Sequence, residues 1–335
     1  LIISMKADSH TIRPYKPGDE ISINSGFNGV FGMDRPLDEW YWKFGRDGDG
    51  GSNIMLAVGE DNEVLVNFST LGSRIQVDGK ILKCAQAVDC YSLQRDYVVR
   101  KKLYLKTYDA YRLQFGKNNE IAFLYGCLGR KHLKLGRLVM NYTEHVPITY
   151  LSKQMNFFCK AWGIFMSRPI WNFFTLRNDV ELNKVGDLWT KSSGRYPVSV
   201  IRDKEYVYRR YLSCPGNKYY YVTVESNNLP AGFAVLTLDN RILKWIDLIW
   251  DGRDSSIITE LERRIWNLAV KLGVRKVEMW LCNDNEVKEL LKTRGLLEGK
   301  NPYELFITTT PLEPGIDSYE LSKRMYLTMG DTDMV

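Results

Sequence analysis

The sequence predicts a mixed α/β (α+β) protein that consists of two similar domains in tandem. Apolar runs separated by short turns at residues 54–93 indicate antiparallel strands, and aromatic residues recur at helical spacing just after them. Residues 219–280 repeat this order of strands, a helix and a further strand. A chain of 335 residues has the length of about two ordinary domains. We therefore expect an N-terminal domain at 5–150, a helical connector at 151–180 and a C-terminal domain at 181–335.

Composition and charge narrow the class of protein. The chain is 44% hydrophobic with a formal net charge of +6, and its Lys and Arg residues are scattered rather than gathered in runs. This does not indicate a nucleic-acid partner, and a small anionic ligand would account for it equally well. No CxxC pair and no zinc-ligand spacing is present, so we expect free thiols, no metal and a reducing, cytoplasmic location. The first residues lack the features of a signal peptide, and Met5 is the expected domain start.

The first domain reads as strands, a helix and further strands. "TIRPYKPGDE" indicates a strand and a turn, and "PLDEWYWKF" a short aromatic helix. Within 54–93 the pair Asp78-Gly79 predicts a hairpin among three or four antiparallel strands. The helix that follows ends at Gly116. Its aromatic stripe consists of Tyr104, Tyr108, Tyr111 and Phe115. "EIAFLYG" is the next strand, "RKHLKLGRL" a short helix and "VMNYTEHVPITYL" the last strand.

The second domain shows a similar order. "YYYVTVE" and "AGFAVLTLDN" indicate a hairpin-like pair, and "RILKWIDLIW" is a further strand. "SSIITELERRIWNLAVKLG" predicts a helix that ends at Gly273, and "VRKVEMWL" is the strand after it. A crossover of about 18 residues between two strands implies a parallel pair with a right-handed connection. "NEVKELLKTRG" predicts a last helix.

The segment "MNFFCKAWGIFMSRPIWNFF", residues 155–174, is the part of the chain that comes nearest to a membrane segment. Lys160, Arg168 and Pro169 interrupt it, so it does not have the pattern of a membrane-spanning helix. We interpret it as a helical connector between the domains. The alternative is a peripheral membrane contact, because aromatic and basic residues alternate in it.

The order of elements resembles the GNAT superfamily of acyl-CoA-dependent N-acetyltransferases, and specifically its tandem members. "IRPYKPGDE" resembles the opening strand and first helix of that fold, and "IMLAVGEDNEVLVNF" resembles its first hairpin. "QAVDCYSL" lies where the central strand lies. "VIRDKEYVYRRYLSCPGNKYYYV" and "MYLTMGDTD" resemble tandem GNAT-like proteins that are often linked with surface-polysaccharide biosynthesis. The resemblance implies acetyl-CoA or another acyl-CoA as co-substrate and an amine as acceptor.

The turn after the central strand departs from the family pattern. In a typical GNAT an (R/Q)-x-x-G-x-(G/A) turn binds the CoA pyrophosphate with backbone N–H groups at the N-terminus of the next helix. The matching positions, 98–103, contain no glycine. One interpretation is that Arg100, Lys101 and Lys102 contact phosphate through their charge; the other is that they are solvated residues of a structural helix. The resemblance places the other donor contacts at Cys90, Tyr91, Ser92, Val99 and Leu103.

Attack of an amine on a thioester needs a base for the amine proton and a proton donor for the leaving thiolate. The resemblance makes Asp89, on the central strand, and Glu60, at the end of its hairpin arm, the candidates for the base; alternatively each is a solvent-facing strand residue. Tyr125, at the end of the next strand, and Tyr104, at the start of the helix, are candidates for the donor. His132 is a further candidate acid or base.

The expected acceptor side is aromatic. Trp40 and Trp42 lie where the acceptor-side helices of the fold lie, and they would stack on a sugar or nucleotide or would pack in the core. Tyr326 would reach a cleft between the two halves. Asp331 and Asp333 would suit an amine or cap a turn.

Together these features predict acyl transfer from acyl-CoA to the amine of a small molecule, with an amino sugar among the candidates. The donor would lie in the first domain and the acceptor in the cleft that the second domain bounds. Two alternatives stay open. One is a non-catalytic GNAT-like binding or scaffold protein that has lost the donor turn. The other is an acyltransferase that takes its acyl group from a carrier-protein thioester, with the basic residues at 100–102 facing an acidic partner.

Overall fold

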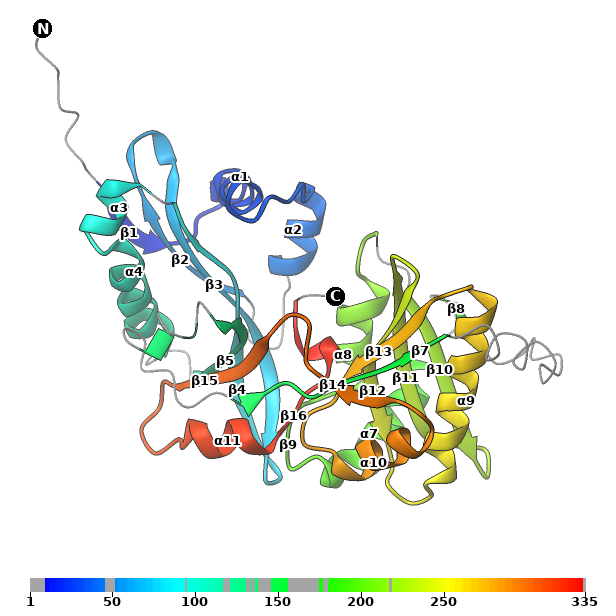
Figure 1. The fold of residues 1–335 in the computed structure, drawn as a ribbon. Coiled ribbons are helices and arrows are strands. Elements are labelled where there is room, and N and C mark those ends of the chain that lie inside the picture. Colours follow the sequence, from blue (N-terminus) through cyan, green and yellow to red (C-terminus); the bar gives the residue numbers. More distant parts are fainter. Residues whose placement is uncertain are drawn as a thin grey trace, which may run out of the picture.

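The structure is a computed structural model. It describes residues 10–45, 52–93, 95–116, 121–130, 133, 136–137, 146–155, 175–176, 180–216 and 219–333. Two β-sheets lie side by side with helices packed against them, and the C-terminus lies between the two sheets (Figure 1). The predicted mixed α/β class is confirmed.

The first sheet has the strand order β1-β2-β3-β4-β5-β15-β6 in the described part of the chain, and β9 pairs with β3 and β16. Its strands are β1 (Thr11–Pro14), β2 (Ser52–Val58), β3 (Val64–Val77), β4 (Lys80–Ser92), β5 (Ile121–Gly129), β6 (Val146–Pro147), β9 (Val198–Val200), β15 (Leu305–Pro311) and β16 (Met325–Tyr326). The β2, β3 and β4 strands are antiparallel, as predicted. Asp78 and Gly79 both have positive φ, the conformation that a two-residue hairpin turn requires, so the predicted hairpin is confirmed.

The second sheet has the order β14-β7-β13-β12-β11-β10-β8 among the described residues. Its strands are β7 (Tyr150–Gln154), β8 (Thr175–Leu176), β10 (Tyr219–Ser226), β11 (Leu229–Asp239), β12 (Ile242–Trp250), β13 (Lys276–Trp280) and β14 (Leu297–Gly299). The β12 and β13 strands are parallel, and the helix α9 (Ser256–Lys271) connects them. The predicted parallel pair is therefore confirmed.

Helices cover both sheets. Besides α9 they are α1 (Asp19–Phe31), α2 (Leu37–Phe44), α3 (Asp96–Arg100), α4 (Leu103–Tyr111), α7 (Leu182–Ser192), α8 (Lys204–Val207), α10 (Asn285–Thr293) and α11 (Ser318–Arg324). The predicted aromatic stripe lies on α4 and the π-helical turn that continues it to Gly116. Tyr108 and Tyr111 are buried and pack around Phe68 of β3, with ring centroids 5.2 and 4.9 Å apart. The stripe therefore belongs to the core, as its spacing indicated.

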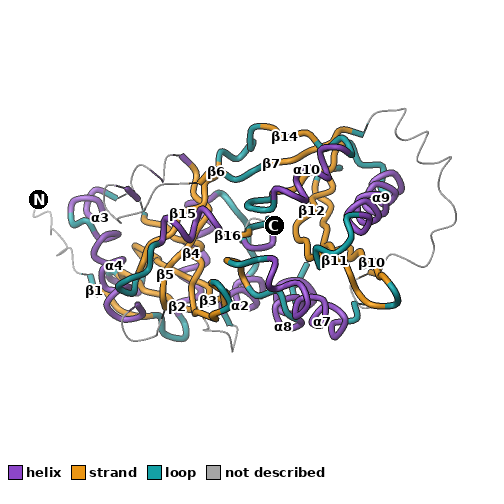
Figure 2. Tube along the Cα trace, turned by 90° about the horizontal axis from the view of Figure 1, so that it is seen from below, coloured by secondary structure: helices purple, strands orange, loops and turns teal. Residues whose placement is uncertain are grey.

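Strands are exchanged between the two halves of the chain. β9, β15 and β16 come from the second half and belong to the first sheet, and β15 pairs along its whole length with β5. Both views show β15 beside β5 (Figures 1 and 2). The segment that leads into β7 passes from the first sheet, where β6 pairs with β15, to the second. The two sheets therefore cannot be separated by one cut in the sequence.

The exchange bears on three expectations of the sequence. The expected last strand of the first domain is divided, because Val146–Pro147 is β6 of the first sheet and Tyr150–Gln154 is β7 of the second. The expected helical connector begins at residue 151, within β7, and residues 156–174 of it lie outside the described part of the chain. The domain boundaries at 150 and 181 stay predictions.

The core is continuous across the junction. One cluster of buried side chains includes Ile75, Phe123 and Tyr125 of the first sheet together with Trp245 and Ile249 of the second. Burial of this apolar surface holds the sheets together. Among the helices that the structure describes, none is long and apolar enough to cross a membrane.

We expect Gly232→Ala to destabilise the fold. Gly232 lies on β11 beneath α9, and a Cβ atom there would lie 2.6 Å from Ile257 Cγ2 and 2.9 Å from Leu261 Cδ1. The overpacking should lower the free energy of unfolding by about 1–3 kcal/mol, measured by urea denaturation. Gly29→Ala is the control, because Gly29 is in α1 and a Cβ there meets nothing within 4 Å. Equal stability of the two variants would contradict the close approach of α9.

Candidate active site

A cavity of about 490 Å³ lies at the junction of the two sheets. Its wall is built by α2, by β3, β4 and β5 of the first sheet, by β11 and β12 of the second, and by the C-terminal segment. Charged side chains of both signs line it, among them Lys43, Arg74, Arg210, Asp239 and Asp333. A wall of mixed charge suits a small polar molecule better than an apolar one.

The cavity reaches the point at which β4 and β5 separate. The two strands pair in parallel from Lys83 to Gln86, and the last pair of the register is Gln86 with Tyr125. Beyond it β4 continues to Ser92 and β5 to Gly129 without pairing to each other. Gln86 and Tyr125 both line the cavity. A fork between parallel strands therefore opens next to the cavity and leaves backbone groups of both strands available to a ligand.

A β-bulge at Asp89 shapes one arm of the fork. The β3–β4 register shifts between Asn67 and Ser69, and Asp89 has a φ of 50°. A left-handed conformation is uncommon for a residue other than glycine and persists only where the surroundings hold it. Asn67 supports it, because its Nδ2 donates a hydrogen bond of 2.9 Å to the Asp89 carbonyl.

The carboxylate of Asp89 forms ion pairs rather than lining the cavity. It is 1% exposed, and its oxygens accept hydrogen bonds from Arg35 and from Lys43 Nζ at 2.6 Å. Lys43 Nζ also lies 3.1 Å from Asp333 Oδ2 of the C-terminal segment. Burial favours a lower pKa for Lys43, but the charges of Asp333 and Asp89 outweigh it, so the pKa of Lys43 is raised. The role of Asp89 as base stays a prediction, and the structure gives it a part in holding α2 and the C-terminus.

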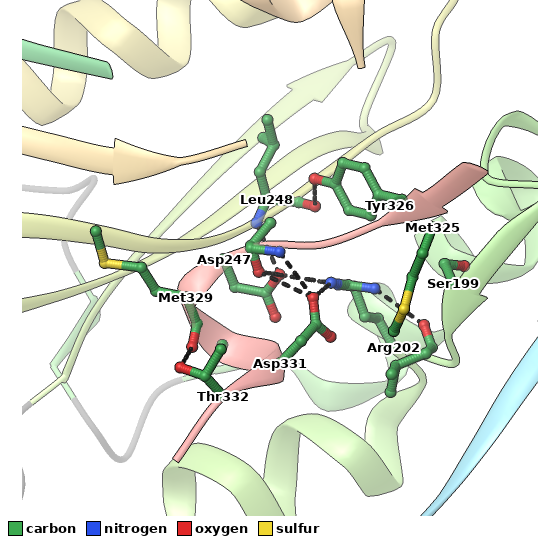
Figure 3. Close-up of polar contacts among 12 residues, drawn as sticks. Ser199, Arg202, Asp247, Leu248, Met325, Tyr326, Met329, Asp331 and Thr332 are labelled. Carbon is green, nitrogen blue, oxygen red and sulfur yellow. Dashed lines mark hydrogen bonds and ion pairs between the residues drawn. The ribbon is translucent and has the colours of Figure 1, made fainter. Parts of the chain in front are cut away.

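The C-terminal segment forms a second buried cluster beside the cavity, and Figure 3 shows its polar contacts. Arg202, with no exposed side-chain surface, contacts Asp247 of β12 through Nε at 2.9 Å and Asp331 through Nη2. Thr328 donates its backbone N–H to Asp331 Oδ2 at 2.8 Å and its hydroxyl to Asp247 Oδ1 at 3.1 Å. Asp331 thereby caps the turn Met329–Asp331, one of the two roles considered for it.

Asp331 is the unusual acid of this cluster. Burial and the nearby Asp247 carboxylate raise its pKa to about 6, although the Arg202 charge acts in the opposite direction. Its Oδ1 atom is buried and has no hydrogen-bond partner among the described residues. A carboxyl group with these properties can exchange a proton near neutral pH.

The structure places one of the other predicted catalytic residues at the cavity and two away from it. Tyr125 lines the cavity and its hydroxyl lies 3.5 Å from the Asp331 carbonyl. Glu60 is exposed in the β2–β3 turn, and Tyr104 is half-buried against the core beside Phe68, so neither is part of the cavity wall. His132 lies outside the described part of the chain. All of these roles stay predictions.

Of the three predicted aromatic acceptor residues, Trp42 lines the cavity, where its Nε1 donates to Ser213 Oγ at 3.2 Å. Trp40 is 2% exposed and packs in the core between Tyr15 and Phe44. Tyr326 does not reach the cavity, because its ring is buried and its hydroxyl donates to the Leu248 carbonyl at 2.8 Å.

The expected donor turn is partly helical, because α3 ends at Arg100 and α4 begins at Leu103, with a turn at 101–102 in which Lys102 has a φ of 52°. The Val99 amide donates to the Arg95 carbonyl at 3.1 Å and the Lys102 amide to the Val99 carbonyl at 3.0 Å. Two of the amides that would face a pyrophosphate are therefore bonded within the turn. Val98 and Leu103 are buried in the core. The backbone does not form the open loop that this site has in the GNAT pattern.

The side chains of the turn differ in exposure. Lys101 and Lys102 are exposed, and Val99 is 61% exposed, so these residues meet solvent. The Arg100 side chain lies outside the described part of the structure. On β4, Tyr91 is buried and its hydroxyl donates to the Ile23 carbonyl at 3.2 Å. The two remaining predicted contacts, Cys90 and Ser92, are half-buried, and the Cys90 thiol lies 3.5 Å from the Ser69 carbonyl.

Sequence reasoning missed Lys43, Arg202 and Asp247. Asp247 carried a signal, because it is a lone charged residue inside the apolar run "RILKWIDLIW", and a buried charge in a strand needs a partner. Arg202 begins the polar run "RDKE", and Lys43 is one lysine near the end of the short helix "LDEWYWKF". Nothing local distinguishes them from solvated residues.

We expect the variant Asp331→Asn to change how stability depends on pH. The folded-state pKa of Asp331, about 6, lies above the ordinary 3.8, so the folded protein holds a proton more tightly than the unfolded chain in this window. The free energy of unfolding of the wild type relative to the variant should therefore fall as pH rises from about 4 to about 6 and then level off. Urea denaturation at a series of pH values measures it. Asp187→Asn, on the exposed side of α7, is the control, and a pH-independent difference for Asp331→Asn would contradict the assignment.

No protein-family model and no curated protein matches the sequence. Solved structures match the fold. A probable N-acyltransferase from Enterococcus faecalis V583 superposes with a TM-score of 0.65 at 9% identity, over 91% of this chain and 73% of that chain. N-myristoyltransferase of Saccharomyces cerevisiae with bound myristoyl-CoA superposes with a TM-score of 0.59 at 12% identity, over 98% and 85%. A GCN5-related N-acetyltransferase from Kribbella flavida superposes with a TM-score of 0.61 at 12% identity, over 90% of this chain and 71% of that chain.

At these low identities the superpositions establish the fold alone. The chemistry has to be argued from the residues of the site. The superpositions extend over at least nine-tenths of this chain, so they include both sheets and the cavity between them. The resemblance noted from the order of elements is thereby confirmed at the level of fold. The chain has the GNAT fold in its tandem form, the fold of the N-acyltransferases on which it superposes.

Proposed function

We propose that the protein transfers an acyl group from acyl-CoA to the amine of a small molecule. The observation that carries this proposal is the meeting of the β4–β5 fork with the cavity at Gln86 and Tyr125. A thioester held in the fork would present its carbonyl to an acceptor in the cavity. Backbone N–H groups of separated strands are suited to stabilise the oxyanion that develops during acyl transfer.

The cavity wall supports an amine acceptor. The carboxylates of Asp239 and Asp333 lie on the wall, where each is paired with a lysine, Lys244 and Lys43, so the wall suits a polar amine better than a neutral apolar one. The rings of Trp42 and Tyr206 also line it and would offer flat apolar faces of the kind on which sugar rings stack. An amino sugar is therefore a candidate acceptor within the wider class of small amines.

The donor end would use charge rather than an open phosphate loop. The amides of Val99 and Lys102 are bonded within the turn, whereas the Lys101 and Lys102 side chains are exposed at the N-terminus of α4. Charged side chains can hold a pyrophosphate without close backbone approach. The same exposed residues, together with Val99, favour a second candidate, in which the acyl group arrives on the thioester of an acidic carrier protein.

We expect acetyl-CoA or a longer acyl-CoA to raise the melting temperature of the protein, since a ligand at about 100 times its Kd stabilises by about 2.7 kcal/mol. The double variant Lys101→Ala/Lys102→Ala should weaken this binding roughly two- to thirtyfold, the range for two exposed charge contacts of about 0.2–1 kcal/mol each. Titration calorimetry with CoA measures the change. Lys80→Ala, at the exposed β3–β4 hairpin, is the matched control.

The outcomes separate the candidates. Binding of acyl-CoA followed by release of free thiol when a small amine is added supports the transferase. No binding of any acyl-CoA, combined with acyl transfer from an acyl carrier protein, supports the second candidate. Binding without thiol release from a panel of amines would contradict acyl transfer and favour a non-catalytic binding protein.

A further inference from the structure

A chain of hydroxyl groups connects the cavity with the buried carboxylates of the C-terminal cluster. Tyr206, at the α8 helix, lines the cavity, and its hydroxyl lies 3.3 Å from the hydroxyl of Tyr211. The Tyr211 hydroxyl donates to Asp247 Oδ2 at 2.8 Å. Tyr211 has no exposed surface, so the second half of this path is shielded from solvent. Hydroxyl groups in such a row can pass a proton from one to the next.

The path can open and close by a small movement. The Tyr206 hydroxyl has two acceptors within reach, the Gly330 carbonyl at 3.1 Å and the Tyr211 oxygen at 3.3 Å. Rotation about one C–O bond moves its hydrogen from one acceptor to the other. Gly330 is also the residue that permits the close packing, because a Cβ atom there would collide with the Tyr211 hydroxyl and lie 3.1 Å from Asp247 Oδ2.

The inner end of the path has capacity for a proton. Asp247 and Asp331 share one guanidinium, that of Arg202, so the buried cluster carries two carboxylates and a single cation. Asp331 Oδ1 lacks a hydrogen-bond partner in the described chain, and a proton on the pair would relieve the uncompensated charge. The pKa of Asp331, raised to about 6 by burial and by Asp247, is consistent with proton exchange near neutral pH.

Other groups face the cluster from each neighbouring element. The Tyr326 ring of β16 lies 4.7 Å from the Arg202 guanidinium, and Arg210, beside Tyr211, donates to the carbonyls of Gly330 and Thr332. Cys84 and Tyr125 approach from the first sheet, and burial is the main cause that raises the pKa of each well above its ordinary range. Asp331 is therefore the group of this cluster that can exchange a proton around pH 6. The Thr328 hydroxyl connects it with Asp247, because its oxygen lies 3.1 Å from Asp247 Oδ1 and 3.4 Å from Asp331 Oδ2.

We propose that Tyr206 and Tyr211 conduct the proton of the acceptor amine from the cavity to the Asp247–Arg202–Asp331 cluster. This inference rests on the acyl transfer proposed above. The amine nitrogen bonds to the acyl carbon and the C–S bond breaks. The amine proton goes to the Tyr206 oxygen, as the Tyr206 proton goes to Tyr211 and the Tyr211 proton to Asp247 Oδ2. The proton then returns by the same path to the thiolate, so that amide and free thiol are the products and no net proton is consumed.

The variants Tyr211→Phe and Tyr206→Phe test the path. With acetyl-CoA as donor and glucosamine as probe amine, each should lower kcat by about 100-fold or more, in the range for general acid–base groups, with little change in KM for acetyl-CoA. The wild-type kcat should fall below about pH 6, where the cluster is already protonated. The control is Tyr150→Phe, because its hydroxyl also donates to a buried carboxylate, Glu278 Oε2 at 2.8 Å, but outside the cavity. Wild-type kcat and pH profile in both Tyr206 and Tyr211 variants would overturn the proposal.

A second measurement does not depend on turnover. Carbon-13 NMR of labelled aspartate should show a carboxyl group that titrates near pH 6 in the wild type and disappears in Asp331→Asn. In Tyr211→Phe its pKa should rise by about half a unit or more, because the ionised cluster loses a hydrogen bond. No carboxyl titration between about pH 5 and 7, or none that responds to Tyr211→Phe, overturns the relay. If the wild type transfers no acyl group from any donor to any amine, the proposed function is overturned. The NMR titration still tests the cluster in that case.

Discussion

The guanidinium of Arg202 lies fully buried where the two sheets and the C-terminal segment meet. It contacts Asp247 of the second sheet, Asp331 of the C-terminal segment and, through Nη1 at 3.0 Å, the carbonyl of Val200 in β9, which pairs with the first sheet. A buried charge is tolerated only when it is paired and hydrogen-bonded, so these three parts must come together for any of them to be in place. The cavity lies between these three parts, so it forms when they come together.

A second buried group completes the wall. Lys43 of α2 lies between Asp89 of β4 and Asp333 at the end of the described chain. It thereby ties α2 and the C-terminal segment to the bulge at the β4–β5 fork. Fixed charges inside a shielded cleft act more strongly than the same charges in water. Both clusters thus position the cavity and set its electrostatic character.

The site lies in a GNAT fold, but the turn that was expected to bind the donor departs from the GNAT pattern. The fork and the cavity meet at Gln86 and Tyr125, which is the geometry that an acyl transfer between two substrates needs. The turn that would bind a pyrophosphate is closed by hydrogen bonds, because the amides of Val99 and Lys102 donate to the carbonyls of Arg95 and Val99. The difference arises because this turn is packed by the apolar side chains of Val98 and Leu103, whereas a glycine turn would leave its amides open. In the proposed function, recognition of the donor would therefore depend on side chains.

The sequence by itself determined the class of the fold, the three antiparallel strands, the hairpin at Asp78 and the amphipathic helices, because these depend on side-chain periodicity and turn chemistry within short segments. It also placed Trp42 and Tyr125, which do line the cavity. Only the tertiary structure decided the strand exchange, the burial of Trp40 and Tyr326, and the two ion clusters. Arg202 and Asp331 are 129 residues apart, and Lys43 and Asp333 are 290 apart. No local pattern encodes such pairs, because a buried charge meets its partner only when the whole chain has folded.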